Sequence, residues 1–144
     1  MTTRRYGRGE RYEHRILRAL ASIYAIDICD HNVRESRDRL RWVIHSHVDD
    51  DLNTQNVSDG FSTAAEVILH TNIICADALA DAETIQFVDY AASRGGRFRR
   101  SWSYMAGDQD ESLFSLLPPR QDDEAVHYSE LIEYPDPKRA GVDR

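Results

Sequence analysis

The spacing of the apolar residues changes at Gly96, and this change constrains the fold of the 144-residue chain more than any other feature. Before Gly96, apolar residues recur every three or four positions, which predicts amphipathic helices. After it, in the stretch RFRRSWSYM, the aromatic residues Phe98, Trp102 and Tyr104 fall on alternate positions together with Arg100. This alternation predicts a strand, because successive side chains of a strand point to opposite faces.

Four helices are predicted in the first part of the chain, over residues 10–29, 33–48, 63–80 and 82–93. Asn32 can cap the second helix, and Thr63 with Glu66 forms a capping-box pair at the start of the third. Asp81 can cap the fourth helix, which the RGG run at 94–96 would end.

Two strands, over residues 97–105 and 125–134, are predicted to pair in an antiparallel fashion after the helices. The expected fold class is therefore mainly α: a small four-helix domain with a C-terminal two-stranded hairpin-like extension and an irregular tail. Residues 1–96 would form the helical core with a basic N-terminal arm. Residues 97–144 would add the strands, an acidic apolar loop and the tail to the same domain.

Cysteine content and hydropathy set the expected environment of the chain. Cys29 and Cys75 each lie in an apolar run, which predicts two buried, reduced thiols, while the possibility of a disulfide stays open. The sequence has no apolar run of transmembrane length and no apolar segment typical of a secretory signal. We therefore expect a protein of the cytoplasm, or of a particle assembled there, without a cofactor.

The charged residues are segregated along the chain, whose formal net charge is -7. Lys138 is the single lysine, so 17 of the 18 basic residues are arginine. Residues 94–107 contain four arginines and no acid, whereas residues 60–93 contain five acids and no base. Residues 108–144 contain four bases against ten acids. Such blocks can pair within the chain, with a partner, or with copies of the same chain.

The favoured function is a non-enzymatic protein–protein interaction or assembly protein, such as a small structural component of a viral or mobile-element complex. The expected partner is another protein or further copies of the chain. An apolar knot between acidic flanks and the arginines of the predicted strand would make the contacts. The residues predicted to bind the partner are Arg97, Arg99, Arg100, Leu113, Phe114, Leu116 and Leu117.

Nucleic-acid binding is the first alternative, because arginines interleaved with aromatic residues suit phosphate contact and base stacking. The sequence pI of about 5.3 argues against a dedicated nucleic-acid binder. The residues predicted for this alternative are Arg4, Arg5, Arg8, Arg97, Arg99, Arg100 and Trp102.

A small metal-dependent hydrolase is the second alternative, with His45, His47 and Asp49 of the run HSHVDDD as ligands. Over six residues this run resembles the His-x-His-x-Asp-His run of the metallo-β-lactamase fold, but Asp50 stands where the last histidine is expected. That fold places the run at a strand end in a much larger sandwich, so we do not assign the chain to it. On a helix, residues two apart diverge, which favours a solvated helix face.

A second polar stripe has residue types that can form a metal site in a helical bundle, but we expect it to be a solvent-exposed helix face. The stripe consists of Glu66, His70, Asp77 and Asp81. The sequence contains no P-loop, Gly-x-Gly-x-x-Gly, Gly-x-Ser-x-Gly or Cys-x-x-Cys motif. No catalytic residue is predicted.

Overall fold

The computed structural model describes residues 2–52, 57–105 and 120–141, without the side chains of residues 2–8 and 49–52. Within this part of the chain the elements follow in the order α1 (Thr2–Ala21), β1 (Ala25–Asp27), α2 (Asp30–Leu52), α3 (Asp59–Asn72), β2 (Ile73–Cys75), β3 (Gln86–Ser93), β4 (Arg97–Tyr104), β5 (Val126–His127) and the 3-10 helix η1 (Tyr128–Glu133). β1 and β2 form a parallel pair, and β3, β4 and β5 form an antiparallel sheet in that order.

The predicted fold class, a mainly α four-helix domain, is wrong, because the described chain combines three α-helices with two sheets. The segment predicted as a fourth helix forms β3, in which buried Val88 and Tyr90 alternate with exposed Asp89 and Ala91. β3 pairs with β4 along its whole length. Pairing with a distant strand therefore decides the structure of a segment whose local apolar spacing also suits a helix.

The RGG run closes the β3–β4 hairpin instead of ending a helix. Gly95 and Gly96 have φ values of 68° and 70°, a region that favours glycine. A Cβ on Gly96 would also lie 2.9 Å from Nε2 of His127, so the turn packs tightly against β5. Gly96 is thus required both by the backbone conformation and by the lack of space.

The helix boundaries differ from the predicted ones at several ends. α3 begins after Ser58, whose Oγ accepts a hydrogen bond from the Phe61 N–H at 3.1 Å, so Thr63 is not the cap. α3 ends at Asn72 and continues directly into β2, which ends at Cys75. The helix predicted to residue 80 is therefore too long. α2 begins at Asp30, two residues before the predicted cap Asn32.

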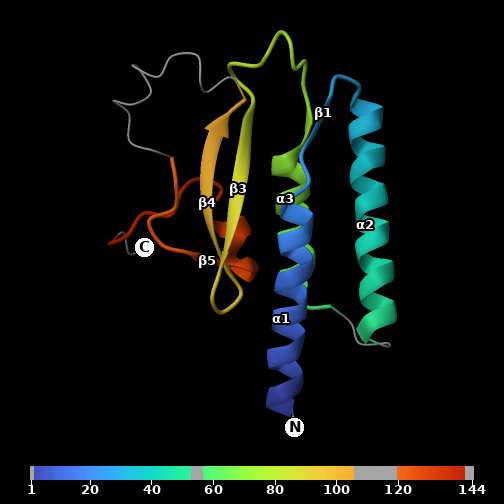
Figure 1. Cartoon of the computed structure of the whole chain (residues 1–144), viewed down its shortest axis with the longest axis vertical. Helices are drawn as coiled ribbons and strands as arrows, with labels where there is room; N and C mark the ends of the chain where they lie inside the picture. Colours follow the sequence, from blue (N-terminus) through green and yellow to red (C-terminus); the bar gives the residue numbers. More distant parts are fainter. Residues whose placement is uncertain (1, 53–56, 106–119, 142–144) are drawn as a thin grey trace.

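The core lies where α1 and α3 face the inner side of the β3–β4–β5 sheet, with α2 on the far side of the helices (Figure 1). The fully buried side chains at its centre are Leu17, Phe61, Ile68, Leu69, Phe98, Val126 and Leu131. α2 is tied to this core by polar contacts as well as apolar ones: the Arg37 side chain donates to the Ile73 carbonyl at 2.6 Å, and Arg41 pairs with Glu66.

The C-terminal segment, residues 120–141, is tied to the outer edge of β4. Of the predicted strand 125–134, only Val126 and His127 pair with β4, and the next six residues form η1. A buried ion pair between Arg100 and Asp122 joins the segment to the strand. The tail beyond η1 is also hydrogen-bonded, since the Asp123 N–H donates to the Lys138 carbonyl at 2.8 Å.

Both cysteines are free and exposed, so the prediction that they are buried is wrong. Cys75 ends β2, and Cys29 lies two residues beyond the end of β1. In the described ranges, no helix combines the length and the apolar character that crossing a membrane requires.

Candidate interaction surface

The arginines of the described chain divide into two groups according to their partners. The first group forms ion pairs within the chain and consists of Arg34, Arg39, Arg41, Arg100, Arg120 and Arg139. Arg37 belongs with them, because its guanidinium donates two hydrogen bonds to the Ile73 carbonyl oxygen. The chain therefore satisfies these guanidinium groups with its own acceptors.

The second group is exposed and forms no ion pair with any residue that the structure describes. We call it the arginine patch: Arg11, Arg15, Arg18, Arg94, Arg97 and Arg99. In the described chain the Arg99 side chain makes one polar contact, from its Nε to the Asp122 carbonyl at 2.9 Å, so no described carboxylate pairs with its charge. Arginine stays protonated at neutral pH, so this surface keeps its positive charge.

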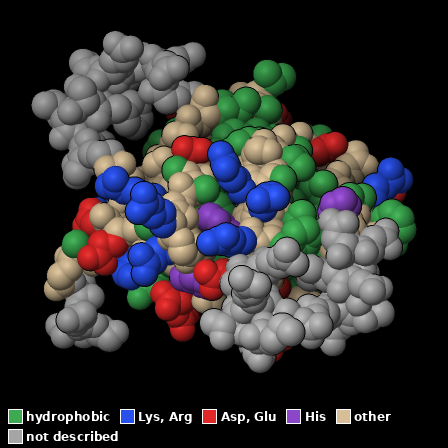
Figure 2. Space-filling model, turned by 60° about the horizontal axis from the view of Figure 1, so that its bottom comes forward, with side chains coloured by type: hydrophobic (Ala, Val, Ile, Leu, Met, Phe, Trp, Pro, Cys, Tyr) green, Lys and Arg blue, Asp and Glu red, His purple; other side chains and the backbone are tan. Residues whose placement is uncertain are grey.

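A contact between α1 and the hairpin brings the two halves of the arginine patch together. Nε2 of His14 lies 2.8 Å from the Arg97 carbonyl oxygen, and the His14 ring packs 4.6 Å from the Phe98 ring. Arg11 and Arg18 are three residues before and four residues after His14, so they lie beside it on the surface of α1. Figure 2, which views this end of the molecule, shows Lys and Arg side chains gathered close together.

Two exposed acids border the arginine patch without neutralising it. Glu10 faces His127, with 3.4 Å between Oε2 and Nε2, and Asp89 stands on β3 opposite Ser101. Glu13 is buried and accepts hydrogen bonds from the Ser58 and Tyr128 hydroxyls at 2.6 and 2.7 Å. Burial and this carboxylate raise the pKa of Tyr128. Glu13 therefore stabilises the interior and is not part of the surface that borders the arginine patch.

The α1 part of the arginine patch was missed in the sequence, although a signal was present. Arginines stand at positions 4, 8, 11, 15 and 18, and this alternation of four and three residues keeps them on one stripe of an α-helix. From the sequence, Arg4, Arg5 and Arg8 were assigned to a basic N-terminal arm and to the nucleic-acid alternative, whereas their backbone belongs to α1. Their side chains lie outside the described ones.

Arg100 does not belong to this surface, although it was predicted to bind a partner. Its side chain is 2% exposed, and that of Asp122 is 0% exposed. Nε and one terminal nitrogen of Arg100 donate to the two Asp122 oxygens at 2.8 and 2.9 Å. Arg100 shares the inner face of β4 with Phe98, so the alternation that predicts the strand also directs this arginine inward.

Of the other residues predicted to make contacts, four are not described and Trp102 lies apart from the arginine patch. Leu113, Phe114, Leu116 and Leu117 lie outside the described residues. Trp102 is half-buried on the inner face of β4, where the guanidinium carbons of Arg100 and Arg120 lie 4.9 and 5.7 Å from its ring. Trp102 is therefore no stacking platform beside Arg97 and Arg99.

The predicted metal ligands do not converge. His45 is half-buried with its ring 6.4 Å from that of Phe61, His47 is exposed on the same helix, and the side chain of Asp49 is not described. In the second stripe, Glu66 pairs with Arg41, and α3 ends before Asp77. Among the residues in the three described ranges, no group of three or more His, Cys, Asp or Glu side chains could hold a metal ion.

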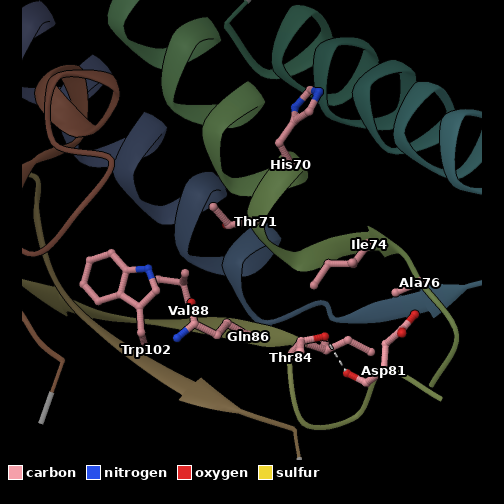
Figure 3. Close-up of a pocket in the computed structure, with 10 residues that line it drawn as sticks. His70, Thr71, Ile74, Ala76, Asp81, Thr84, Gln86, Val88 and Trp102 are labelled. Atoms are coloured by element: carbon pink, nitrogen blue, oxygen red, sulfur yellow. Dashed lines mark hydrogen bonds between the residues drawn. The ribbon is translucent and has the colours of Figure 1, made fainter. Parts of the chain in front are cut away.

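A groove lies between α3, the β2–β3 loop and the inner face of the hairpin (Figure 3). It consists of two adjoining cavities of about 390 Å³ and about 250 Å³, which share His70, Thr71, Val88 and Trp102. Nε2 of Gln86 is buried in its lining without a hydrogen-bond partner. The Thr71 and Tyr90 hydroxyls bond to each other at 2.8 Å, and burial raises the pKa of Tyr90 to about 12. These hydroxyls are therefore used structurally.

A serine, a histidine and a glutamate also meet near η1. Nδ1 of His127 lies 2.8 Å from Ser129 Oγ, and its Nε2 faces Glu10. The backbone N–H of Ser129 donates to the same Nδ1 at 3.1 Å, which makes His127 the cap of η1. A neutral imidazole nitrogen has one lone pair that can accept a hydrogen bond, and that of Nδ1 accepts from the Ser129 N–H. The group therefore joins α1 to the C-terminal segment and does not activate a nucleophile.

Comparisons with protein-family models, with curated proteins and with solved structures find no match to this chain. Its function is therefore inferred from its own residues.

Proposed function

We propose that the protein is a non-enzymatic interaction or assembly protein that binds an acidic protein surface through the arginine patch. The observation that carries the proposal is the division of the arginines. Six are paired with carboxylates of the chain, whereas the arginine patch gathers exposed arginines on α1 and the hairpin that have no such partner among the described residues. Like charges held together repel each other, and an anionic partner relieves this repulsion.

Arginine suits a protein partner because its planar guanidinium can bind a carboxylate through two parallel hydrogen bonds. Each exposed pair contributes only about 0.2 to 1 kcal/mol. Several pairs that lose water together fix the orientation of the partner and speed its approach. The arginine patch would then select the docking geometry, while apolar contacts add affinity.

The position of Trp102 favours a protein partner over nucleic acid. The formal net charge of -7 opposes the long-range attraction of any strongly anionic partner, although a local patch can still attract one. Trp102 lies away from the patch, on the inner face of β4 and against Arg100, so it cannot stack nucleic-acid bases there. Phosphate contact by the arginines alone remains the alternative outcome of the test.

The test measures binding of fluorescent poly-L-glutamate and of a DNA duplex at several salt concentrations. The patch variant carries Arg15→Glu and Arg97→Glu. A matched control carries Arg34→Glu and Arg39→Glu, which change the charge equally at exposed, ion-paired positions of α2. We expect the patch variant to bind poly-L-glutamate at least about tenfold more weakly than the control does, a difference of about 1.4 kcal/mol.

Equal losses in the two variants would refute a specific role for the arginine patch. Tighter binding of the duplex than of poly-L-glutamate, with a steep salt dependence, would instead assign the patch to nucleic acid.

A further inference from the structure

The end of the molecule at the β2–β3 loop carries acids that have no ion-pair partner among the described residues. We call this surface the acidic end: Asp27 at the end of β1, with Asp77, Asp81 and Glu83 in the β2–β3 loop. None of these carboxylates forms an ion pair with a residue in the described parts of the chain. In Figure 1 the β2–β3 loop lies at the top of the longest axis, whereas the hairpin turn lies lower, beside the middle of α1.

The acidic end is held in shape by its own hydrogen bonds. Oδ1 of Asp77 accepts from the backbone N–H groups of Leu79 and Ala80 at 2.9 and 3.1 Å. Oδ2 of Asp81 accepts from the Asp77 N–H at 3.2 Å, and the Asp81 carbonyl accepts from the Ile85 N–H at 3.0 Å. The carboxylates are therefore presented on an ordered loop, which lowers the entropy lost when a partner binds.

Two large apolar side chains are exposed among these acids. Leu79 is 96% exposed at the tip of the β2–β3 loop, and Ile28 is 70% exposed just beyond β1. An apolar centre inside a charged rim is the usual composition of a protein interface. In the arginine patch the exposed side chain next to Arg99 in the hairpin register is the small apolar Ala91.

We propose that the acidic end of one copy docks on the arginine patch of the next copy, which joins the chains head to tail. This inference rests on the proposed function and names the partner as the chain itself. The two surfaces differ and consist of separate parts of one molecule, so each bound copy leaves a free surface of each kind. A contact of this type forms rings if its rotation closes, and filaments if it does not.

The experiment compares sedimentation of the full chain at low and high salt with that of two variants. The first is the patch variant, Arg15→Glu with Arg97→Glu. The second is an acidic-end variant, Leu79→Arg with Glu83→Arg; no side-chain hydrogen bond or ion pair of these two residues is seen in the described chain. As a control, circular dichroism of both variants is compared with that of the wild-type chain to check that they are folded.

We expect the wild-type chain to form oligomers at low salt that dissociate as salt rises. Each variant alone should associate at least about tenfold more weakly. An equimolar mixture of the two variants should associate again, because each retains one native surface and the altered surfaces are complementary in charge. This recovery separates a head-to-tail contact from a symmetric one.

A second measurement locates the contact without altering either surface. The exposed Cys29 and Cys75 flank the acidic end, and a photoreactive maleimide attached there should cross-link to residues 9–21 or 94–99 of another copy. A wild-type chain that stays monomeric at about millimolar concentration and low salt overturns the inference. A variant mixture that does not recover also overturns it. Neither result refutes the proposed function if the arginine patch still binds poly-L-glutamate.

Discussion

Replacing Asp122 by leucine tests how the C-terminal segment is held. The carboxylate of Asp122 accepts hydrogen bonds from the Arg100 N–H, Nε and a terminal nitrogen at 2.7, 2.8 and 2.9 Å, and from the Lys138 N–H at 2.8 Å. Its loss leaves a guanidinium that is 2% exposed without its counter-charge. Removing one partner of a buried pair costs about 3 to 5 kcal/mol.

The cost of Asp122→Leu should fall toward the lower end of this range. Arg100 keeps two neutral acceptors, the carbonyl oxygens of Tyr134 and Asp136. A loss of about 3 kcal/mol would still be a large fraction of the usual stability of a domain, about 5 to 15 kcal/mol. Urea unfolding followed by circular dichroism measures the change, and hydrogen exchange should show residues 120–141 opening first.

The double variant Arg100→Met with Asp122→Leu is the control. Because it removes both charges, it should be more stable than Asp122→Leu alone. A loss below about 1 kcal/mol for Asp122→Leu, typical of an exposed pair, would refute the description of this pair as buried and essential.

Three further outcomes follow from the described contacts. Gly96→Ala should lower the urea midpoint, because a side chain there is strained at φ 70° and meets His127; an unchanged midpoint would contradict this turn. The Arg41 guanidinium lowers the pKa of Glu66, so this pair contributes stability that is present above the ordinary value of 4.5 and lost as pH falls through the lower folded value. In Glu66→Gln the free energy of unfolding should therefore fall less between neutral and acidic pH than in the wild-type chain. The difference should be less than about 1 kcal/mol, since the pair is partly exposed. Burial raises the pKa of Tyr90 to about 12, so the alkaline absorbance titration should lose a component near pH 12 in Tyr90→Phe.

The sequence was sufficient to predict the elements whose local pattern agrees with their surroundings. The helical apolar spacing in the first half corresponds to α1 and α2, although residues 25–27 of the first predicted helix form β1 instead. The alternation after Gly96 corresponds to β4. It failed at β3, because Ile85, Val88 and Ala92 have helical spacing while pairing with β4 sets the conformation. The local spacing of apolar residues does not predict which distant strand a segment will pair with.

The candidate surface was predicted only in part, for similar reasons. The block of four arginines at 94–107 indicated a basic surface, but it did not show that Arg100 has a buried partner 22 residues away. Arg100 falls between Phe98 and Trp102 on one face of the predicted strand, and this position already indicated that it points inward. Placing α1 beside the hairpin required the contact between His14 and Arg97.

Arginine-specific modification with phenylglyoxal, read by mass spectrometry, tests the role of the arginine patch most directly. In the free chain, Arg11, Arg15 and Arg97 should react readily, and buried Arg100 should not. Saturating poly-L-glutamate should protect the first three and leave Arg34 and Arg39 on α2 unchanged. Equal protection of all exposed arginines, or none at the arginine patch, would contradict the claim that this surface is where the protein binds its partner.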